Sequence, residues 1–236
     1  MIPGTGYLEL IRAALKPEPQ SVLELRDTTF LSPFVVHADQ ARTLRVRAMA
    51  TADGVLDIAI FGRAENAPPA EAWTEHVRSQ AQWVPFKLLE KAPAPLPLGQ
   101  LKDRCKLRTQ SFNEPPQPVH LQFGPRWNCL RRIDFGASEA LITLELPTAF
   151  SADLNTFALH PALMDWATAG AQALVPDYDE QTCFYVPAAY GVLRLHAPLQ
   201  AQVFSHVRLR ADDTQPGELA VFDVTVCDAQ GCVLVD

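Results

Sequence analysis

The 236-residue sequence has no apolar run close to the roughly 18–20 residues that a membrane-spanning helix needs. Basic residues are also in short supply, because 20 Lys and Arg stand against 27 Asp and Glu, for a formal net charge of -7. Such an acidic chain has no general electrostatic reason to bind nucleic acid. The opening MIPGTGYLEL has no basic segment ahead of an apolar core, so we expect no secretory signal. These deficits argue against membrane, nucleic-acid-binding and secreted proteins.

Cysteine is scarce as well, and its count is odd. The five residues are scattered along the chain, at Cys105, Cys129, Cys183, Cys227 and Cys232. The last two flank a DAQG turn, but no His or second cysteine pair accompanies them, so the pattern does not predict a zinc site. We therefore predict five reduced thiols in a cytoplasmic protein and no bound metal.

The common catalytic and phosphate-binding motifs are absent from the sequence. It contains no G-x-S-x-G elbow, no phosphate loop and no dinucleotide fingerprint. The PGTG segment at residues 3–6 follows no strand pattern and carries no Lys, so it is a poor phosphate cradle. Exposed N–H groups at the start of the helix that follows would suit a carbonyl oxygen better.

Apolar residues make up 48% of the chain, as in ordinary globular domains, and 20 prolines divide it into segments. Apolar spacings of three and four residues predict helices over residues 5–15 and 160–175. Asp53-Gly54 and Gln230-Gly231 are expected to form tight turns. Alternating patterns predict strands over residues 22–31, 41–51, 55–64, 71–84, 129–146 (two strands around a turn at Gly136), 184–197, 201–211, 218–229 and 231–236.

Each half of the chain thus combines one apolar helix with a run of antiparallel strands, which is an α+β arrangement. We predict an N-terminal unit over residues 1–84 and a C-terminal unit over residues 121–236. A proline-rich linker over residues 85–120, with one short helix at 98–107, is expected to join them. We expect each long helix to lie inside a curved antiparallel sheet, so that the two units form a pseudo-dimer within one chain.

Asp165 is the residue whose setting points most directly to chemistry. It lies in HPALMDWATAG, on an otherwise apolar helix, where burial would raise its carboxyl pKa and suit it to general acid catalysis. The alternative is a carboxylate near the helix start that the helix dipole stabilises. His160 is expected to cap or pack, and His196 and His206, in alternating strands, to face solvent.

Two aromatic segments have both a structural and a functional interpretation. LQFGPRW at residues 121–127 is either a Gly-Pro turn packed under Phe123 and Trp127 or part of a site. Tyr185 and Tyr190, on either side of Pro187, either line a pocket or are ordinary strand aromatics.

Four stretches resemble the dehydratase domain of modular type I polyketide synthases. They are PGTGYLEL at 3–10, FGPRW at 123–127, LHPALMD at 159–165 and YVPAAYGVLRLHAPLQAQVFSHVRLR at 185–210. With the strand pattern between them, the resemblance covers essentially the whole chain. It implies a double hotdog fold, in which each of two units is a curved antiparallel sheet around an apolar helix.

The resemblance also implies an activity. Domains of this family dehydrate a β-hydroxyacyl thioester, delivered on the phosphopantetheine arm of an acyl carrier protein, to an α,β-unsaturated thioester in polyketide biosynthesis. A histidine removes the α-proton and an aspartate protonates the departing hydroxyl; here the matching aspartate is Asp165. The protein would bind no cofactor directly, would work beside neighbouring synthase domains, and would form a homodimer if it follows family precedent. The positions expected to contact substrate are Gly4, Phe123, Gly124, Pro125, Leu163 and Tyr190.

The sequence departs from the family pattern in three places. Pro3 matches the end of the HxxxGxxxxP motif, so the catalytic histidine and the opening strand are expected upstream of Met1 rather than in this chain. Ala169 stands where the DxxxQ or DxxxH motif has the partner of the aspartate, although Gln172 is expected on a similar helix face. Phe123 replaces the tyrosine of the YGP motif.

These departures leave alternatives to dehydration open. Dehydratase-like domains with this fold also act as pyran- or furan-forming cyclases or as double-bond isomerases, and some are catalytically inactive structural modules. Asp165 favours dehydration, whereas Ala169 weakens that inference.

Overall fold

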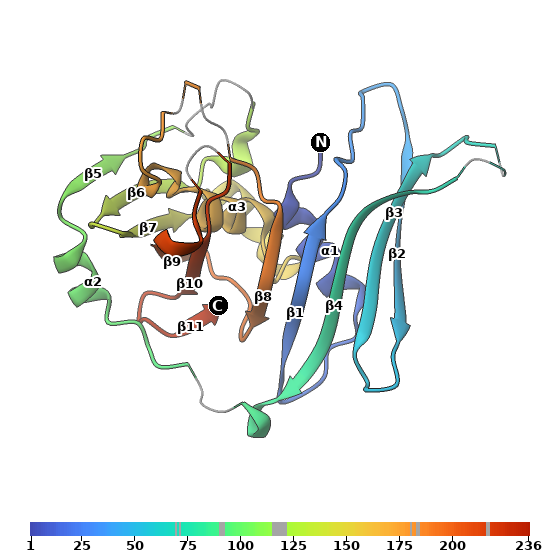
Figure 1. The fold of residues 1–236 in the computed structure, drawn as a ribbon, viewed down its shortest axis with the longest axis horizontal. Helices are drawn as coiled ribbons and strands as arrows, with labels where there is room; N and C mark the ends of the chain where they lie inside the picture. The colour runs from blue at the N-terminus through green and yellow to red at the C-terminus, as the bar shows by residue number, and fades with distance from the viewer. Residues whose placement is uncertain are drawn as a thin grey trace. The chain divides into compact units, whose positions relative to one another are not determined.

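The computed structural model describes residues 1–68, 70, 72–89, 93–114, 122–179, 181–182, 185–215 and 218–236 (Figure 1). The chain divides into two compact units. The first comprises Met1–Lys91 and Pro187–Leu195, and the second comprises Ala92–Val186 and His196–Asp236.

The described part of the first unit contains one long helix and an antiparallel sheet. The helix is α1 (Gly4–Ala14), which buries Tyr7, Leu8 and Ile11 against the sheet; removing Leu8 or Ile11 from water stabilises the unit by about 1.5–3 kcal/mol each. At the turn between β2 and β3, Gly54 has a φ of 78°, which the predicted Asp-Gly turn requires. Across the sheet the order is β2 (Arg42–Ala50), β3 (Leu56–Ala64), β4 (Thr74–Pro85), β1 (Ser21–Phe30) and β8 (Ala189–Leu195), with the short 3-10 turn η1 (Phe86–Leu88) after β4.

The described part of the second unit repeats this plan. Its long helix is α3 (Pro161–Ala169), which packs against β7 and β9 and buries Leu163 and Met164. A shorter helix, α2 (Leu98–Arg104), precedes the sheet. The strand order is β11 (Val233–Val235), β10 (Phe222–Cys227), β9 (Gln202–Leu209), β7 (Glu139–Glu145), β6 (Leu130–Phe135) and β5 (Arg108–Ser111). The 3-10 turns are η2 (Pro125–Trp127), η3 (Thr148–Asn155), η4 (Gln172–Leu174) and η5 (Ala211–Asp213).

The compact units differ from the predicted domains in two places. Strand β8 belongs to the first unit because it pairs with β1, whereas the alternation at 184–197 was assigned to the C-terminal unit. Residues 93–114 belong to the second unit, although they lie inside the predicted linker over 85–120. The reason is that α2 contributes to the core. Leu101 of α2 and Cys105, its C-cap residue, belong to a buried cluster with Leu141, Phe204 and Cys227.

Strand β5 was not predicted from the sequence. Its four residues, RTQS, show no apolar alternation and are all exposed, yet they pair in register with β6. Backbone hydrogen bonds rather than side-chain burial hold this edge strand, so no pattern of hydrophobicity marks it.

Helix α3 is shorter than the helix predicted over residues 160–175. It ends at Ala169, with Gly170 as its C-cap, instead of continuing to residue 175. Gln172 lies in η4, and its side chain exchanges hydrogen bonds with the backbone of Tyr185 (Nε2 to O 3.0 Å; backbone N to Oε1 3.3 Å). The prediction that Gln172 shares the helix face of Asp165 is therefore wrong.

The expectation that His196 and His206 face solvent is also wrong. His206 is 8% exposed and lies on β9, which is paired on both sides, by β7 and β10. Its Nε2 lies 2.7 Å from Oε2 of Glu139. The side chain of His196 is 11% exposed and its Nε2 lies 3.4 Å from a carboxylate oxygen of Asp236. Acidic side chains cover both imidazoles, a tertiary effect that strand alternation does not reveal.

Glu139 should contribute to stability in a pH-dependent way. Hydrogen bonds from the Arg104 guanidinium, opposed by burial and reinforced by His206, lower the pKa of Glu139 to about 2. A depressed folded-state pKa stabilises the protein above the unfolded pKa of about 4.3, and this contribution is lost as pH falls toward 2. Glu139→Gln should cost about 1–2 kcal/mol at pH 7, discounted because the Arg104 side chain is half exposed. Urea unfolding between pH 7 and pH 2.5 should show the free energies of unfolding of wild type and Glu139→Gln becoming more alike as pH falls. A difference between them that stays constant with pH would contradict this role of Glu139.

The four cysteines that the structure describes are free thiols, and Cys183 lies outside the described residues. Burial raises the pKa of both Cys129 and Cys227 to about 12, whereas Cys232 is exposed. In the native protein, alkylation should therefore modify Cys232 much faster than Cys129 or Cys227. After denaturation without reductant, mass measurement should show all five thiols modified. A stable disulfide between Cys227 and Cys232 would contradict the prediction of reduced thiols.

Within the described residues, no helix is both long and apolar enough to cross a membrane.

Candidate active site

Asp165 lies on α3, more than one turn beyond the helix start. Pro161 occupies the first position, where its missing N–H costs no hydrogen bond, and His160 is the N-cap residue. The favourable effect of a helix dipole on a carboxylate falls off within the first turn, so it does not account for an aspartate at this position. The neighbouring side chains of Leu163 and Met164 point into the core, while Asp165 lies half-buried at its edge.

The carboxyl group of Asp165 has a neutral hydrogen-bond donor. Nε1 of Trp127 donates to Oδ2 of Asp165 at 2.8 Å. Burial raises the pKa of Asp165, and the hydrogen bond from Trp127 opposes this rise only in part. No ion pair to Asp165 occurs within the described residues, so no cation there pulls its pKa down. These surroundings thus favour the protonated form of the carboxyl more than those of an ordinary aspartate do.

An aromatic cluster surrounds this hydrogen bond. The 3-10 turn η2 begins after Gly124 and carries Trp127 on its last residue. The ring of Phe123 stacks on that of Trp127, with centroids 6.0 Å apart, and contacts Trp166 at 5.3 Å. Nε1 of Trp166 in turn donates to the backbone oxygen of Trp127 at 2.9 Å. These contacts fix the indole that meets Asp165.

A largely apolar cavity of about 210 Å³ lies beside the start of α3. One of its walls is Trp127, the residue that holds Asp165. His160 also lines it, is 1% exposed, and has a pKa that burial lowers, although Asp153 at 3.5 Å opposes this. Asp153 also pairs with Arg126 at 2.6 Å. The lining residues are Arg126, Trp127, Phe157, His160, Pro161 and Ala162.

The structure groups the expected substrate-contacting residues by unit. In the second unit, Phe123, Gly124 and Pro125 form the turn that brings Trp127 to Asp165, and Leu163 is fully buried. In the first unit, Gly4 opens α1 so close to Phe30 that an added Cβ would lie 3.2 Å from its ring. Tyr190 meets that same ring edge-on, with centroids 5.9 Å apart.

Sequence reasoning did not identify Trp127 as the partner of Asp165, because it left the segment at 121–127 open between a packed turn and part of a site. The available signal was its indole N–H, a donor that phenylalanine lacks and that usually finds an acceptor when it is buried.

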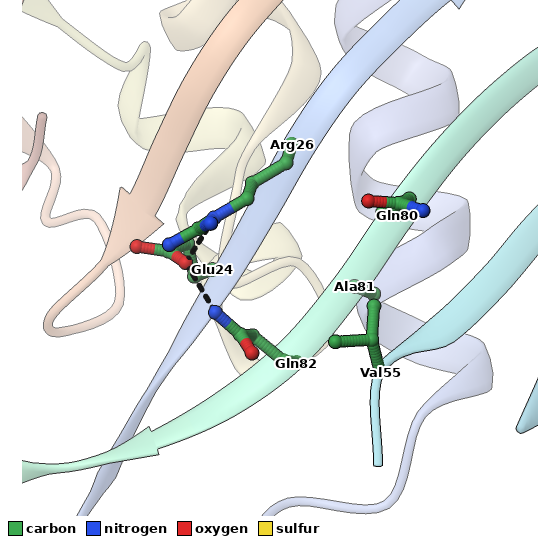
Figure 2. A pocket seen from close by; sticks show the side chains of 6 residues that line it. All are labelled: Glu24, Arg26, Val55, Gln80, Ala81 and Gln82. Carbon is green, nitrogen blue, oxygen red and sulfur yellow. Dashed lines mark hydrogen bonds and ion pairs between the residues drawn. The ribbon is translucent and has the colours of Figure 1, made fainter. Parts of the chain in front are cut away.

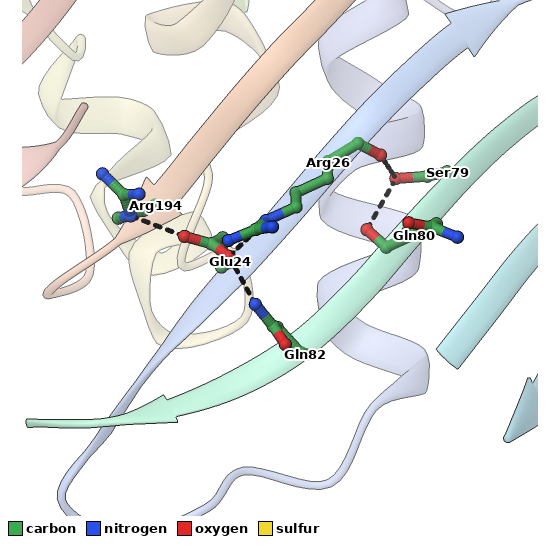
Figure 3. Close-up of polar contacts among 6 residues, drawn as sticks. All are labelled: Glu24, Arg26, Ser79, Gln80, Gln82 and Arg194. Atoms are coloured by element: carbon green, nitrogen blue, oxygen red, sulfur yellow. Dashed lines mark hydrogen bonds and ion pairs between the residues drawn. The ribbon is translucent and has the colours of Figure 1, made fainter. Parts of the chain in front are cut away.

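A second cluster of polar side chains, around Glu24 in the first unit, is structural. Glu24 lines a hollow of about 40 Å³, which is too small for more than a few water molecules. Figure 2 labels the residues that line it. Figure 3 shows Glu24 between β4 and β8, where its carboxylate accepts hydrogen bonds of 2.6 Å from each of Arg26, Gln82 and Arg194. Glu24 is 2% exposed and its acceptors are occupied, so it ties three strands together rather than acting on a ligand.

No grouping of three or more His, Cys, Asp or Glu side chains suited to a metal ion occurs in the part of the chain that the structure describes.

Comparisons with known proteins identify the family to which this sequence is similar. The family model described as "Polyketide synthase dehydratase N-terminal domain" matches residues 93–236, and that described as "Polyketide synthase dehydratase domain" matches residues 1–63. The polyketide synthase PksM of Bacillus subtilis is 23% identical over all of this chain, which spans 6% of that protein's length.

Among solved structures, a trans-AT polyketide synthase dehydratase domain from Brevibacillus brevis matches with a TM-score of 0.85 and 21% identity, over 99% of this chain and 82% of that one. An inactive mutant of the CurK dehydratase, with asparagine in place of an aspartate, matches with a TM-score of 0.77 and 19% identity, over 99% and 80%. These likenesses confirm the predicted α+β, double hotdog fold.

Proposed function

Because the chain belongs to the polyketide synthase dehydratase family, we propose that it removes water from a β-hydroxyacyl thioester to give an α,β-unsaturated thioester. The substrate would arrive on the phosphopantetheine arm of an acyl carrier protein, within a larger synthase whose neighbouring domains supply and take up the intermediate. The reaction is an elimination that moves two protons and changes no oxidation state overall, so this proposal assigns no bound cofactor to the domain. We place the activity in the cytoplasm, in keeping with the reduced thiols predicted from the sequence.

The observation that carries this proposal is the protonatable carboxyl of Asp165. Hydroxide is a poor leaving group and needs an acid to protonate it as the C–O bond breaks. Asp165 has a pKa raised by burial, a neutral donor on one oxygen, and no cationic partner in the described residues. Such surroundings favour the protonated form, from which the carboxyl can donate. In the CurK dehydratase, replacement of an aspartate by asparagine accompanies inactivity, which is consistent with an essential aspartic acid.

The proposed elimination needs one base and one acid. A base takes the proton from the carbon next to the thioester carbonyl, and the electron pair of that C–H bond forms the new double bond. The C–O bond at the β-carbon breaks, and its oxygen takes the proton of Asp165 and leaves as water. The base ends protonated and Asp165 ends as a carboxylate, so one proton transfer through solvent resets both. We assign the base to the histidine of the family's HxxxGxxxxP motif.

The test uses the polypeptide extended upstream to include the HxxxGxxxxP motif. It would be incubated with an acyl carrier protein loaded with a 3-hydroxyacyl thioester, and the thioester would be followed by mass spectrometry. We expect the loss of one water and the appearance of a conjugated thioester. Closure of an oxygen ring, or movement of a double bond without loss of water, would instead identify a cyclase or an isomerase, and no change in the presence of the motif would indicate an inactive module.

A further inference from the structure

The general acid of the proposed reaction needs a means of orientation that α3 itself does not provide. In a helix, the side chain four residues after Asp165 lies on the same face and is within reach of its carboxyl. Here that side chain is the methyl group of Ala169, which donates no hydrogen bond. Gln172, the next candidate along the chain, is bound to the backbone of Tyr185. The donor to Asp165 comes from outside the helix, from Trp127 on η2.

Trp127 is itself held on two sides. Phe123 stacks on its ring with an angle of 6° between the planes, and Trp166 hydrogen-bonds its backbone oxygen. Trp166 follows Asp165 directly in α3, so the helix binds the turn through Trp166 and the turn binds the helix through Trp127. This reciprocal pair of hydrogen bonds sets the distance between η2 and the carboxyl of Asp165.

We propose, on the basis of the proposed function, that Trp127 is a positioning residue that fixes the orientation of the Asp165 carboxyl. Its N–H occupies Oδ2, so the transferable proton is left on Oδ1. The substrate hydroxyl then meets one defined O–H rather than a carboxyl that rotates between two orientations. Trp127 thereby takes the place of the side chain that Ala169 does not supply.

A neutral donor suits this role better than a charged one. An arginine beside a carboxyl lowers its pKa by roughly 1–3 units, which would leave the acid ionised at neutral pH. An indole N–H directs the carboxyl through a single hydrogen bond and carries no net charge. Arg126, which directly precedes Trp127 in the sequence, forms an ion pair with Asp153 instead. Trp127 thus orients the Asp165 carboxyl without the large drop in its pKa that a charged donor would cause.

The test replaces Trp127 by phenylalanine, which keeps an aromatic ring against Phe123 and removes the N–H. In the polypeptide extended upstream, Trp127→Phe should lower kcat about tenfold, the cost of removing one hydrogen bond to a buried acceptor, with a smaller change in KM. The alkaline limb of the kcat–pH profile should move to higher pH, because loss of the donor disfavours the carboxylate and raises the pKa of Asp165. A purely structural contribution of Trp127 would not move this limb.

A second measurement does not depend on activity. The Asp165 carboxyl can be titrated by ¹³C NMR in wild type, in Trp127→Phe and in Trp83→Phe, a matched replacement in the first unit. We expect the pKa of Asp165 to rise in Trp127→Phe only. If it does so while wild type fails to dehydrate, the proposed function is wrong but the hydrogen bond has its inferred effect. If the pKa and kcat of Trp127→Phe both equal those of wild type, the positioning role is wrong.

A double variant separates orientation from packing. Trp127→Phe with Ala169→Gln places an amide donor one turn along α3 from Asp165, and should regain part of the lost kcat. If Trp127→Phe loses kcat without any pKa change and the added glutamine restores nothing, loss of packing explains the defect and the proposal is overturned.

Discussion

Asp165→Asn, in the polypeptide extended upstream, should lower the rate of dehydration of a carrier-bound 3-hydroxyacyl thioester by about 10²-fold or more. That is the range expected when a general acid is removed. Asparagine has nearly the same shape, and its side-chain oxygen can still accept the hydrogen bond from Trp127, so the fold should be preserved. The effect should therefore appear in kcat rather than in the amount of folded protein. Single-turnover measurement by mass spectrometry would give the rate directly.

The matched control is Asp223→Asn. Asp223 lies on β10 of the same unit, where it is exposed and pairs with Arg208 at 3.3 Å. This variant should dehydrate at the wild-type rate. Should Asp165→Asn dehydrate as fast as Asp223→Asn, Asp165 would be no more than a carboxylate at the edge of a helix.

Glu24→Gln should lower the free energy of unfolding by about 2–3 kcal/mol at pH 7. The carboxylate of Glu24 is buried and accepts charge-assisted hydrogen bonds from Arg26 and Arg194, each worth more than a neutral one. Both guanidinium groups are partly exposed, with side chains 49% and 37% accessible, which keeps the expected loss below that of a fully buried ion pair. The neutral amide cannot replace the charge that binds β1 to β8.

The difference in free energy of unfolding between wild type and Glu24→Gln should depend on pH. Burial alone would raise the pKa of Glu24, but hydrogen bonds from Gln82, Arg26 and Arg194 together hold it below its ordinary value. A lowered folded-state pKa means that the stabilisation is complete above about pH 4.3 and is lost as pH falls through the folded pKa. Urea unfolding should show a smaller difference in free energy of unfolding between wild type and Glu24→Gln below pH 4 than at pH 7. Glu75→Gln, which loses an exposed pair with Arg78 on the same sheet, should change little at either pH.

Most strands could be predicted because burial on one face of a sheet imposes alternation. The 71–84 segment, whose charges also suit a helix, is a strand from Thr74 to Pro85 because it pairs with β1 and β3 on its two sides. What alternation cannot give is the partner of a strand. The sequence analysis therefore assigned β8 to the C-terminal unit, whereas β8 pairs with β1 in the first compact unit. It also missed β5, whose residues bury no apolar side chain.

The candidate site was predicted only in part for the same reason. Asp165 could be found because a carboxylate on an apolar helix is unusual in any fold. Its partner could not, because Trp127 and Asp165 are 38 residues apart and meet only through tertiary structure. The sequence pointed along the helix, to Ala169 and Gln172, whereas the donor came from a turn outside it. The roles of Gly4, Phe123, Gly124, Pro125, Leu163 and Tyr190 in substrate binding stay predictions.

As a general acid, Asp165 needs surroundings that favour the protonated form of its carboxyl. The most direct test of this requirement is the titration of Asp165 by ¹³C NMR in the 236-residue chain itself, with Asp165→Asn to assign the resonance. We expect an Asp165 pKa above the ordinary aspartate value of about 3.9, because burial disfavours the carboxylate and no cation in the described residues offsets that effect. A pKa at or below that value would show that the site does not favour the protonated carboxyl and would contradict the assignment of Asp165 as the general acid.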